Sequence, residues 1–146
     1  MTAKIVEDPT APNFAISTDK VCYVVVKARE FDVKDELADP DSGSNAIDDG
    51  MVDVLEDSPD DPVRQELVAF INMLNVDEQV DLVALAWLGR GDGSADGWKE
   101  LRAEAADAHN ARTAQYLLSM PLLADYLEAG LDVYGLSCDE FEADVL

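Results

Sequence analysis

The stretch that decides the fold runs from Trp87 to Gly130. It opens with W-L-G-R-G-D at 87–92 and, after a polar break, shows one long helical pattern from Trp98 to Met120. Apolar residues recur in that pattern at the i, i+3 and i+4 spacing, which is typical of an amphipathic helix. Asp96 can cap its beginning, and Pro121 ends or kinks it because proline has no amide donor. The stretch therefore predicts helical packing as the basis of the fold.

Further helices are expected on both sides of this pattern. Asp61 followed by Pro62 is a typical helix start, and Asn75 with Glu78 forms a capping-box pattern. The expected helices cover 19–36, 62–74, 76–88, 121–129 (ended by Gly130) and a short C-terminal segment from Ser137 through Phe141, opened by a second capping-box pattern of Ser137 with Glu140. Gly89 and Gly91 are expected to end the apolar 76–88 helix.

Residues 21–26 leave a second interpretation open. They are rich in β-branched valines, which also suit a strand, but the charged continuation through 36 favours one continuous helix. Few other strand signals are present. The predicted fold is all-α, a small irregular helical bundle with a long acidic loop.

The sequence predicts one helical domain over 18–146, preceded by a flexible N-terminal arm over 1–17 that contains Pro9 and Pro12. The acidic loop covers 35–61, where Asp, Ser, Gly and Pro predominate, and residues 51–55 within it suit a short turn of helix. A calcium-binding loop begun at Asp39 would place glycines at its fifth and closing positions, so this template fails. A solvated loop is therefore expected.

The charge excludes several classes of partner. Ten Lys and Arg residues stand against 32 Asp and Glu, for a formal net charge of -22 in 146 residues. Such a chain repels phosphate backbones and anionic lipid surfaces, so neither direct nucleic-acid binding nor membrane association is expected. A protein with a basic surface remains a suitable partner. The sequence does not fix the oligomeric state.

The cysteines and the N-terminus bear on the compartment. Cys22 and Cys138 match neither a CxxC pair nor a dense disulfide framework, and the first residues lack the apolar core of a signal peptide. No apolar run approaches the roughly 20 residues that span a bilayer. We therefore expect reduced thiols and a cytoplasmic protein.

His109 and Arg112 fall near the middle of the apolar face of the predicted 98–120 helix. A buried cation without a partner is costly, so these groups require either carboxylates or a solvent-filled cleft. In a structural interpretation, Arg112 binds a carboxylate and His109 binds a backbone carbonyl. The candidate carboxylates are Asp81, Asp92, Asp96 and Asp125.

In a functional interpretation, Arg112 and Arg90 hold a carboxylate or phosphate by the planar fork of the guanidinium, and a tryptophan forms an apolar wall. The candidate binding residues are Trp87, Arg90, Asp92, Trp98, His109 and Arg112. His109 could serve as a general base, but no motif of nucleophilic catalysis, phosphate binding or zinc binding accompanies it. Catalytic residues, cofactors and metals are therefore not assigned, and enzymatic activity stays open.

Several long segments resemble a bacterial domain-of-unknown-function family, numbered 3775. They are K-V-C-Y-V-V-V-K-A-R-E-F-D-V-K (20–34), S-G-S-N-A-I-D-D-G-M (42–51), D-L-V-A-L-A-W-L-G-R-G-D (81–92), L-R-A-E-A-A-D-A-H-N-A-R-T-A-Q-Y-L-L (101–118) and P-L-L-A-D-Y-L-E-A-G-L (121–131). The resemblance covers roughly 20–141 and implies a small bacterial cytoplasmic protein without an established activity.

Two functions remain in competition. The first is a non-enzymatic protein-interaction module, favoured by the charge and by the lack of catalytic motifs. The second is a binder of a small anionic ligand, or an enzyme, with an Arg/His cleft. A cleft in which His109 and Arg112 meet solvent would favour the second.

Overall fold

The computed structural model describes residues 12–38, 61–139 and 141, with the backbone alone for 32–38. These residues form helices and connections, without a strand among them, which confirms the all-α prediction. The elements are α1 (Thr18–Ala38), α3 (Pro62–Met73), α4 (Val76–Arg90), a 3-10 turn η4 (Ala95–Gly97), α5 (Trp98–Ala108), α6 (Thr113–Leu118) and α7 (Leu123–Val133). None of the described helices is long and apolar enough to cross a bilayer.

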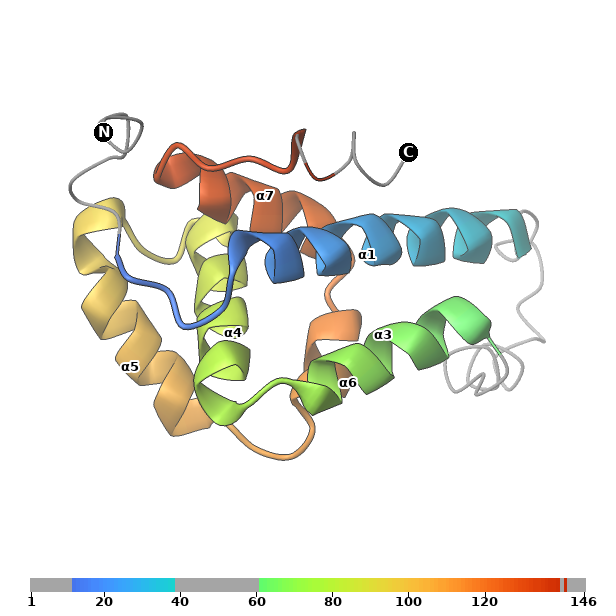
Figure 1. Ribbon diagram of the computed structural model, residues 1–146, viewed down its shortest axis with the longest axis horizontal. Helices are drawn as coiled ribbons and strands as arrows, with labels where there is room; N and C mark the ends of the chain where they lie inside the picture. The colour runs from blue at the N-terminus through green and yellow to red at the C-terminus, as the bar shows by residue number, and fades with distance from the viewer. Residues whose placement is uncertain (1–11, 39–60, 140, 142–146) are drawn as a thin grey trace, which may run out of the picture.

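Helix α4 lies in the middle of the fold, with α5 and α7 packed on it (Figure 1). Its start is fixed by the predicted capping box: Glu78 N–H donates to Asn75 Oδ1 at 2.8 Å, and Asn75 N–H donates to Glu78 Oε1 at 3.0 Å. Apolar residues are buried on several sides of the helix, as expected for a central element. Gly91 ends it in the left-handed conformation, with φ of 102°.

Gly89 and Gly130 do not end helices, contrary to the prediction. Gly89 lies inside α4 and Gly130 inside α7, where the two helices cross in close contact. A Cβ atom on Gly89 would lie 1.7 Å from the Tyr126 carbonyl oxygen, and one on Gly130 would lie 2.4 Å from the Leu85 carbonyl oxygen. The glycines are therefore needed because backbone meets backbone at this crossing.

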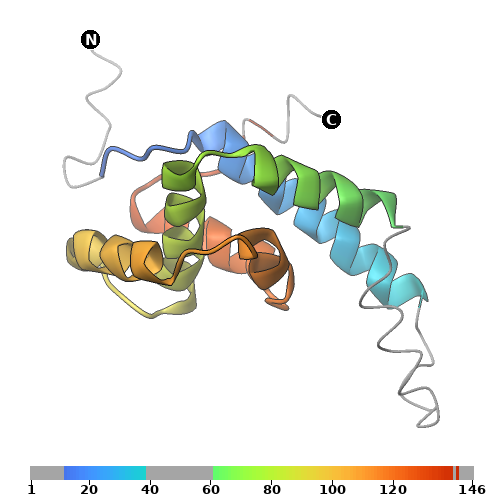
Figure 2. The same ribbon diagram turned by 90° about the horizontal axis from the view of Figure 1, so that it is seen from below.

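Helices α1 and α3 lie side by side and extend together away from α4 (Figures 1 and 2). The aromatic rings of Tyr23 and Phe70 are 4.4 Å apart between centroids, and Lys27 forms an ion pair with Glu66 at 2.8 Å. Asp61 caps α3 by accepting from the amide of residue 63, as predicted. Residues 21–26 lie within α1, so the helical interpretation of this segment is confirmed and the strand interpretation is wrong.

The predicted long helix over 98–120 is wrong, because the chain breaks between α5 and α6. Helix α5 ends at Ala108, and Asn110 Oδ1 accepts from the Arg112 amide at 2.7 Å. The Thr113 hydroxyl in turn donates to the Asn110 carbonyl at 2.9 Å. Such side-chain bonds to nearby backbone compete with helical ones and turn the chain. Asp96 does not cap α5 either, since it lies within the 3-10 turn and the cap position falls on Gly97.

Of the expected arm over 1–17, the structure describes residues 12–17, and these pack on the core. The ring of Phe14 meets Trp98 edge-on at 5.1 Å between centroids, and Ile16 is buried. The amides of Ala15 and Ile16 both donate to the Asp81 carboxylate, which is 1% exposed. Burial of this carboxylate is possible because it accepts several hydrogen bonds.

The expectation of reduced thiols is wrong. Cys22 in α1 and Cys138 after α7 form a disulfide bond, with their Cα atoms 5.5 Å apart. Sequence spacing alone did not reveal this, because 116 residues separate the two cysteines. The argument from reduced thiols to a cytoplasmic location therefore loses its basis.

Two remaining predictions reach beyond the described residues. Residues 35–38 of the expected acidic loop belong to α1, whereas 39–60, with the turn over 51–55 and the rejected calcium loop, lie outside what the structure describes. Glu140 of the C-terminal capping box also lies outside it. Its partner Ser137 accepts from the Asp139 amide at 3.4 Å.

Candidate functional site

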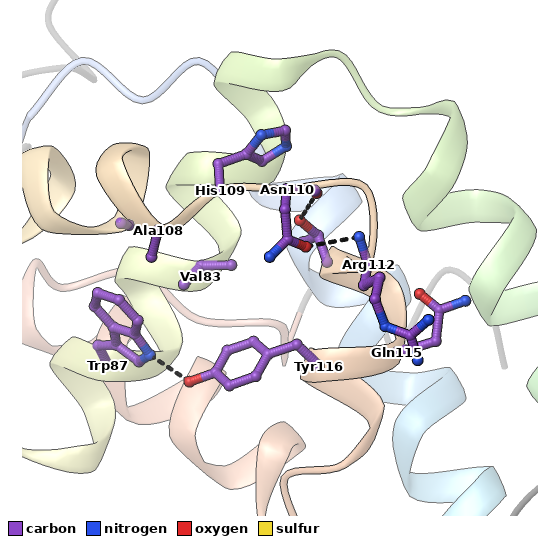
Figure 3. A pocket seen from close by; sticks show the side chains of 10 residues that line it. Val83, Trp87, Ala108, His109, Asn110, Arg112, Gln115 and Tyr116 are labelled. Carbon is purple, nitrogen blue, oxygen red and sulfur yellow. Dashed lines mark hydrogen bonds between the residues drawn. The ribbon is translucent and has the colours of Figure 1, made fainter.

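A pocket of about 420 Å³ opens between α4, α5 and α6 (Figure 3). Helix α4 contributes Val83 and Trp87, and α5 contributes Ala105 and Ala108, which together form an apolar wall. The connection from α5 to α6 and the first turns of α6 supply the polar side. The polar lining residues are His109, Asn110, Arg112, Thr113, Gln115 and Tyr116.

Trp87 and Tyr116 close one side of the pocket. The indole Nε1–H of Trp87 donates to the Tyr116 hydroxyl oxygen at 2.8 Å, and Figure 3 shows the tyrosine ring reaching from α6 towards α4. Tyr116 is 40% exposed, which is high for a large aromatic residue. Aromatic side chains with a polar tip are common in binding sites because they combine apolar area with a hydrogen bond.

Asn110 fixes the turn that forms the polar side. Its Oδ1 is occupied by the Arg112 amide and its carbonyl by the Thr113 hydroxyl. An asparagine side chain also carries an amide nitrogen with two donors. Since Asn110 is exposed and lines the pocket, these donors are available to a ligand.

His109 has a defined tautomer. Gln79 Nε2 donates to the Ile71 carbonyl at 2.8 Å, which turns Gln79 Oε1 towards His109 Nε2 at 2.7 Å. Because Oε1 only accepts, Nε2 carries the proton in the neutral ring and Nδ1 bears the lone pair. Figure 3 shows the ring turned towards the connection of α3 and α4 and away from Tyr116. His109 therefore lies at the rim of the pocket, and it binds a side-chain amide instead of the predicted backbone carbonyl.

Arg112 is exposed, and no ion pair joins its guanidinium to another described residue. The prediction of a buried Arg112 bound to a carboxylate is therefore wrong. The four candidate carboxylates lie elsewhere or bind other groups. Arg102 Nε pairs with Asp81 at 2.6 Å, Arg90 pairs with Asp92 at 2.6 Å, Arg29 pairs with Asp125 at 3.1 Å, and Asp96 lies in η4.

Gln115 adds an unsatisfied group to the pocket. Its Oε1 is buried and is the one buried side-chain polar atom without a hydrogen-bond partner among the described residues. A buried acceptor left unpaired costs about 1–3 kcal/mol, so such atoms often mark sites where a further group binds.

The structure brings together only part of the predicted site. Trp87, His109 and Arg112 line the pocket, whereas Arg90, Asp92 and Trp98 do not. Trp98 instead packs in the core between Phe14 and Tyr134. Arg90 and Arg112 therefore do not line one pocket together.

Arg90 nevertheless lies next to the pocket. The pKa of its guanidinium is raised, chiefly by its hydrogen bond to Asp92 and also by an interaction with the Tyr116 oxygen.

The sequence interpretation missed the roles of Asn110, Gln115 and Tyr116. A signal was present at Asn110, since an Asn followed three residues later by Thr is typical of local side-chain bonds that interrupt helices. No comparable signal marks Gln115 or Tyr116, because their positions depend on how α6 packs against α3 and α4.

A second hollow, of about 340 Å³, has the opposite electrostatic character. Its eight lining residues include four acids, namely Asp125, Glu128, Asp132 and Asp139. Two of these acids are already paired with Arg29. Among the residues whose side chains the structure describes, no three His, Cys, Asp or Glu gather as metal ligands do.

The comparisons with known proteins agree with the resemblance noted in the sequence. No curated protein and no solved structure matches the chain. The family model described as "Protein of unknown function (DUF3775)" matches residues 64–136, which span α3 to α7 and include the whole pocket. The chain therefore belongs to the DUF3775 family of proteins of unknown function.

Proposed function

We propose that the protein binds a small organic anion in the pocket between α4, α5 and α6. The observation that carries this proposal is the lining itself. Ten residues line the pocket, none of them is Asp or Glu, and Arg112 is among them. The chain has 32 acidic residues, yet no carboxylate of the pocket lining would repel a negatively charged ligand.

Arg112 is suited to the anionic group of the ligand. A guanidinium offers five N–H donors in a plane and binds a carboxylate or phosphate through two parallel hydrogen bonds. Arg112 forms no ion pair with another described residue, so a ligand does not have to displace a carboxylate of the protein before it binds. The wall of Val83, Trp87, Ala105 and Ala108 then suits an apolar body attached to that anion.

The pocket volume fits this class of ligand. About 420 Å³ falls at the lower end of the range of roughly 300–1,000 Å³ that is typical of small-molecule sites. Affinity is expected to fall with ionic strength, because Arg112 is exposed and its charge is screened by salt.

The experiment is a thermal-shift screen of carboxylates and organic phosphates at constant ionic strength. A ligand at 100 times its dissociation constant stabilises the folded state by about 2.7 kcal/mol. Arg112→Ala is expected to remove the shift without lowering the stability of the free protein. Lys99→Ala, which removes one exposed positive charge outside the pocket lining, is the matched control and should keep the shift.

If no anion stabilises the protein, or if Lys99→Ala weakens binding as much as Arg112→Ala, the proposal is refuted. The second result would mean that anions respond only to the net charge of the protein.

A second candidate function is a protein-interaction module for a partner with a basic surface. It is supported by the net charge of -22 and by the internal pairing of several cations. Lys20, Lys27, Arg29, Arg90 and Arg102 all form ion pairs with acids of the same chain. Binding to such a partner should weaken steeply with salt and should not respond to Arg112→Ala, which separates the two candidates.

A further inference from the structure

The Tyr116 hydroxyl has a free proton at the Trp87 side of the pocket. Its oxygen accepts from the Trp87 indole at 2.8 Å, and an indole N–H can only donate. The oxygen therefore serves as an acceptor for the indole, and its proton has no acceptor within the described residues.

Arg112 lies on the other side of the pocket. Figure 3 shows its guanidinium beside Gln115 and well separated from the Tyr116 hydroxyl. A single carboxylate therefore cannot contact both groups in this arrangement. The pocket presents hydrogen-bond donors at two separate places, Arg112 at one side and Tyr116 at the other, and the Asn110 amide also lines it.

We infer that the ligand is an elongated carboxylate with a second oxygen acceptor remote from its anionic group, and that Tyr116 donates its hydroxyl proton to that second acceptor. This inference rests on the proposed function and adds the specificity of the same site. A keto acid is the simplest compound of this class, since its carbonyl accepts without adding charge. The carboxylate lies at Arg112, the hydrocarbon part covers the apolar wall, and the ketone meets Tyr116.

The experiment compares two series of ligands by isothermal titration. One series contains methyl-ketone carboxylates of increasing chain length, and the other contains the hydrocarbon acids of the same shape, in which a methyl group replaces the ketone oxygen. At the chain length that spans the pocket, the keto acid is expected to bind about tenfold more tightly, the value of one net hydrogen bond. At shorter lengths the two series should bind equally.

Tyr116→Phe removes the donor and keeps the ring. It should abolish the preference for the keto acid and leave the affinity for the hydrocarbon acid unchanged, which shows that the pocket is intact. The indole N–H resonance of Trp87 reports the local change, and that of Trp98 is the internal control.

Failure of this inference is distinct from failure of the proposed function. If neither series binds, anion binding itself is refuted. If both series bind with a dependence on Arg112, but the keto and hydrocarbon acids are equal at every length, anion binding stands and the role of Tyr116 is refuted. An equal loss for both series in Tyr116→Phe also refutes it, because the tyrosine would then serve the shape of the pocket alone.

Discussion

Replacing Gly89 by alanine tests the crossing of α4 and α7, because two physical effects predict opposite signs. Alanine is favoured over glycine inside a helix by about 1 kcal/mol, so helix propensity alone predicts stabilisation. The added Cβ, however, would lie 1.7 Å from the Tyr126 carbonyl oxygen, and ordinary contact begins at 3.4 Å. The shortfall of about 1.7 Å involves backbone on both sides, so no side-chain rotation relieves it.

The size of the effect follows from this geometry. Overpacking of a core costs roughly 1–3 kcal/mol and sometimes more, and separation of the helices also weakens their remaining contacts. We expect Gly89→Ala to lower the free energy of unfolding by about 3 kcal/mol. Gly130→Ala has a smaller shortfall, of about 1.0 Å from the Leu85 carbonyl oxygen, and should cost about half as much.

The assay is urea unfolding followed by far-UV circular dichroism, with the midpoint and the slope fitted separately. Gly97→Ala is the matched control, because its Cβ would meet only the Ser94 hydroxyl at an ordinary 3.6 Å. Because Gly97 holds the cap position of α5, where alanine is less favourable than glycine, its replacement should cost about 1 kcal/mol and no more. The double variant at 89 and 130 should cost less than the sum of the single ones, since one shift of the helices relieves both contacts. A Gly89→Ala protein as stable as the wild type would refute the close crossing.

Three further predictions concern other contacts of the fold. Asp81→Ala should lower the unfolding free energy by about 3 kcal/mol in urea titrations, because it leaves Arg102 Nε and two backbone amides without their acceptor; an unchanged midpoint would contradict this. Serine at both Cys22 and Cys138 should cost about 4 kcal/mol, since the bond closes a loop of more than 100 residues, and a reducing agent should lower the melting temperature of the wild type but not of that variant. Hydrogen bonds from a lysine and from the capping backbone lower the pKa of Glu78 from its ordinary 4.5, so its contribution is complete above that pKa and is lost as the pH falls through the folded value. The stability difference between wild type and Glu78→Gln, measured by urea unfolding, should therefore shrink on acidification, and a difference independent of pH would oppose this assignment.

Local signals in the sequence predicted the boundaries of α3 and α4 well. The cap at Asp61 and the box of Asn75 with Glu78 depend on residues within one turn, so the sequence contains all the information needed. The all-α fold follows from the same helical periodicity. Trp87 could be proposed for the site because a pocket needs an apolar wall and the chain has only two tryptophans. Arg112 could be proposed because positive charges are few in this acidic chain.

The features that the sequence did not predict depend on distant contacts. A glycine looks the same whether it ends a helix or admits another backbone, so Gly89 and Gly130 were misinterpreted. The burial of Asp81 needs donors from residues 15 and 16, which are more than 60 positions away. The helix break at Asn110 was a local signal, but the apolar periodicity on both sides of it outweighed that signal in the interpretation.

The position of α1 has a consequence for where the folding unit begins. The family match covers 64–136, yet α1 packs on both α3 and α7 and buries Val21, Val24 and Val25 there. A fragment trimmed to the matched residues would expose the apolar faces that α1 covers. During synthesis, α1 leaves the ribosome roughly 100 residues before α7. The part of its apolar face that packs on α7 therefore stays uncovered until α7 has been made. The protein thus completes this part of its core only when α7 has been synthesised, and the pocket-bearing part depends on a helix that lies outside the matched residues.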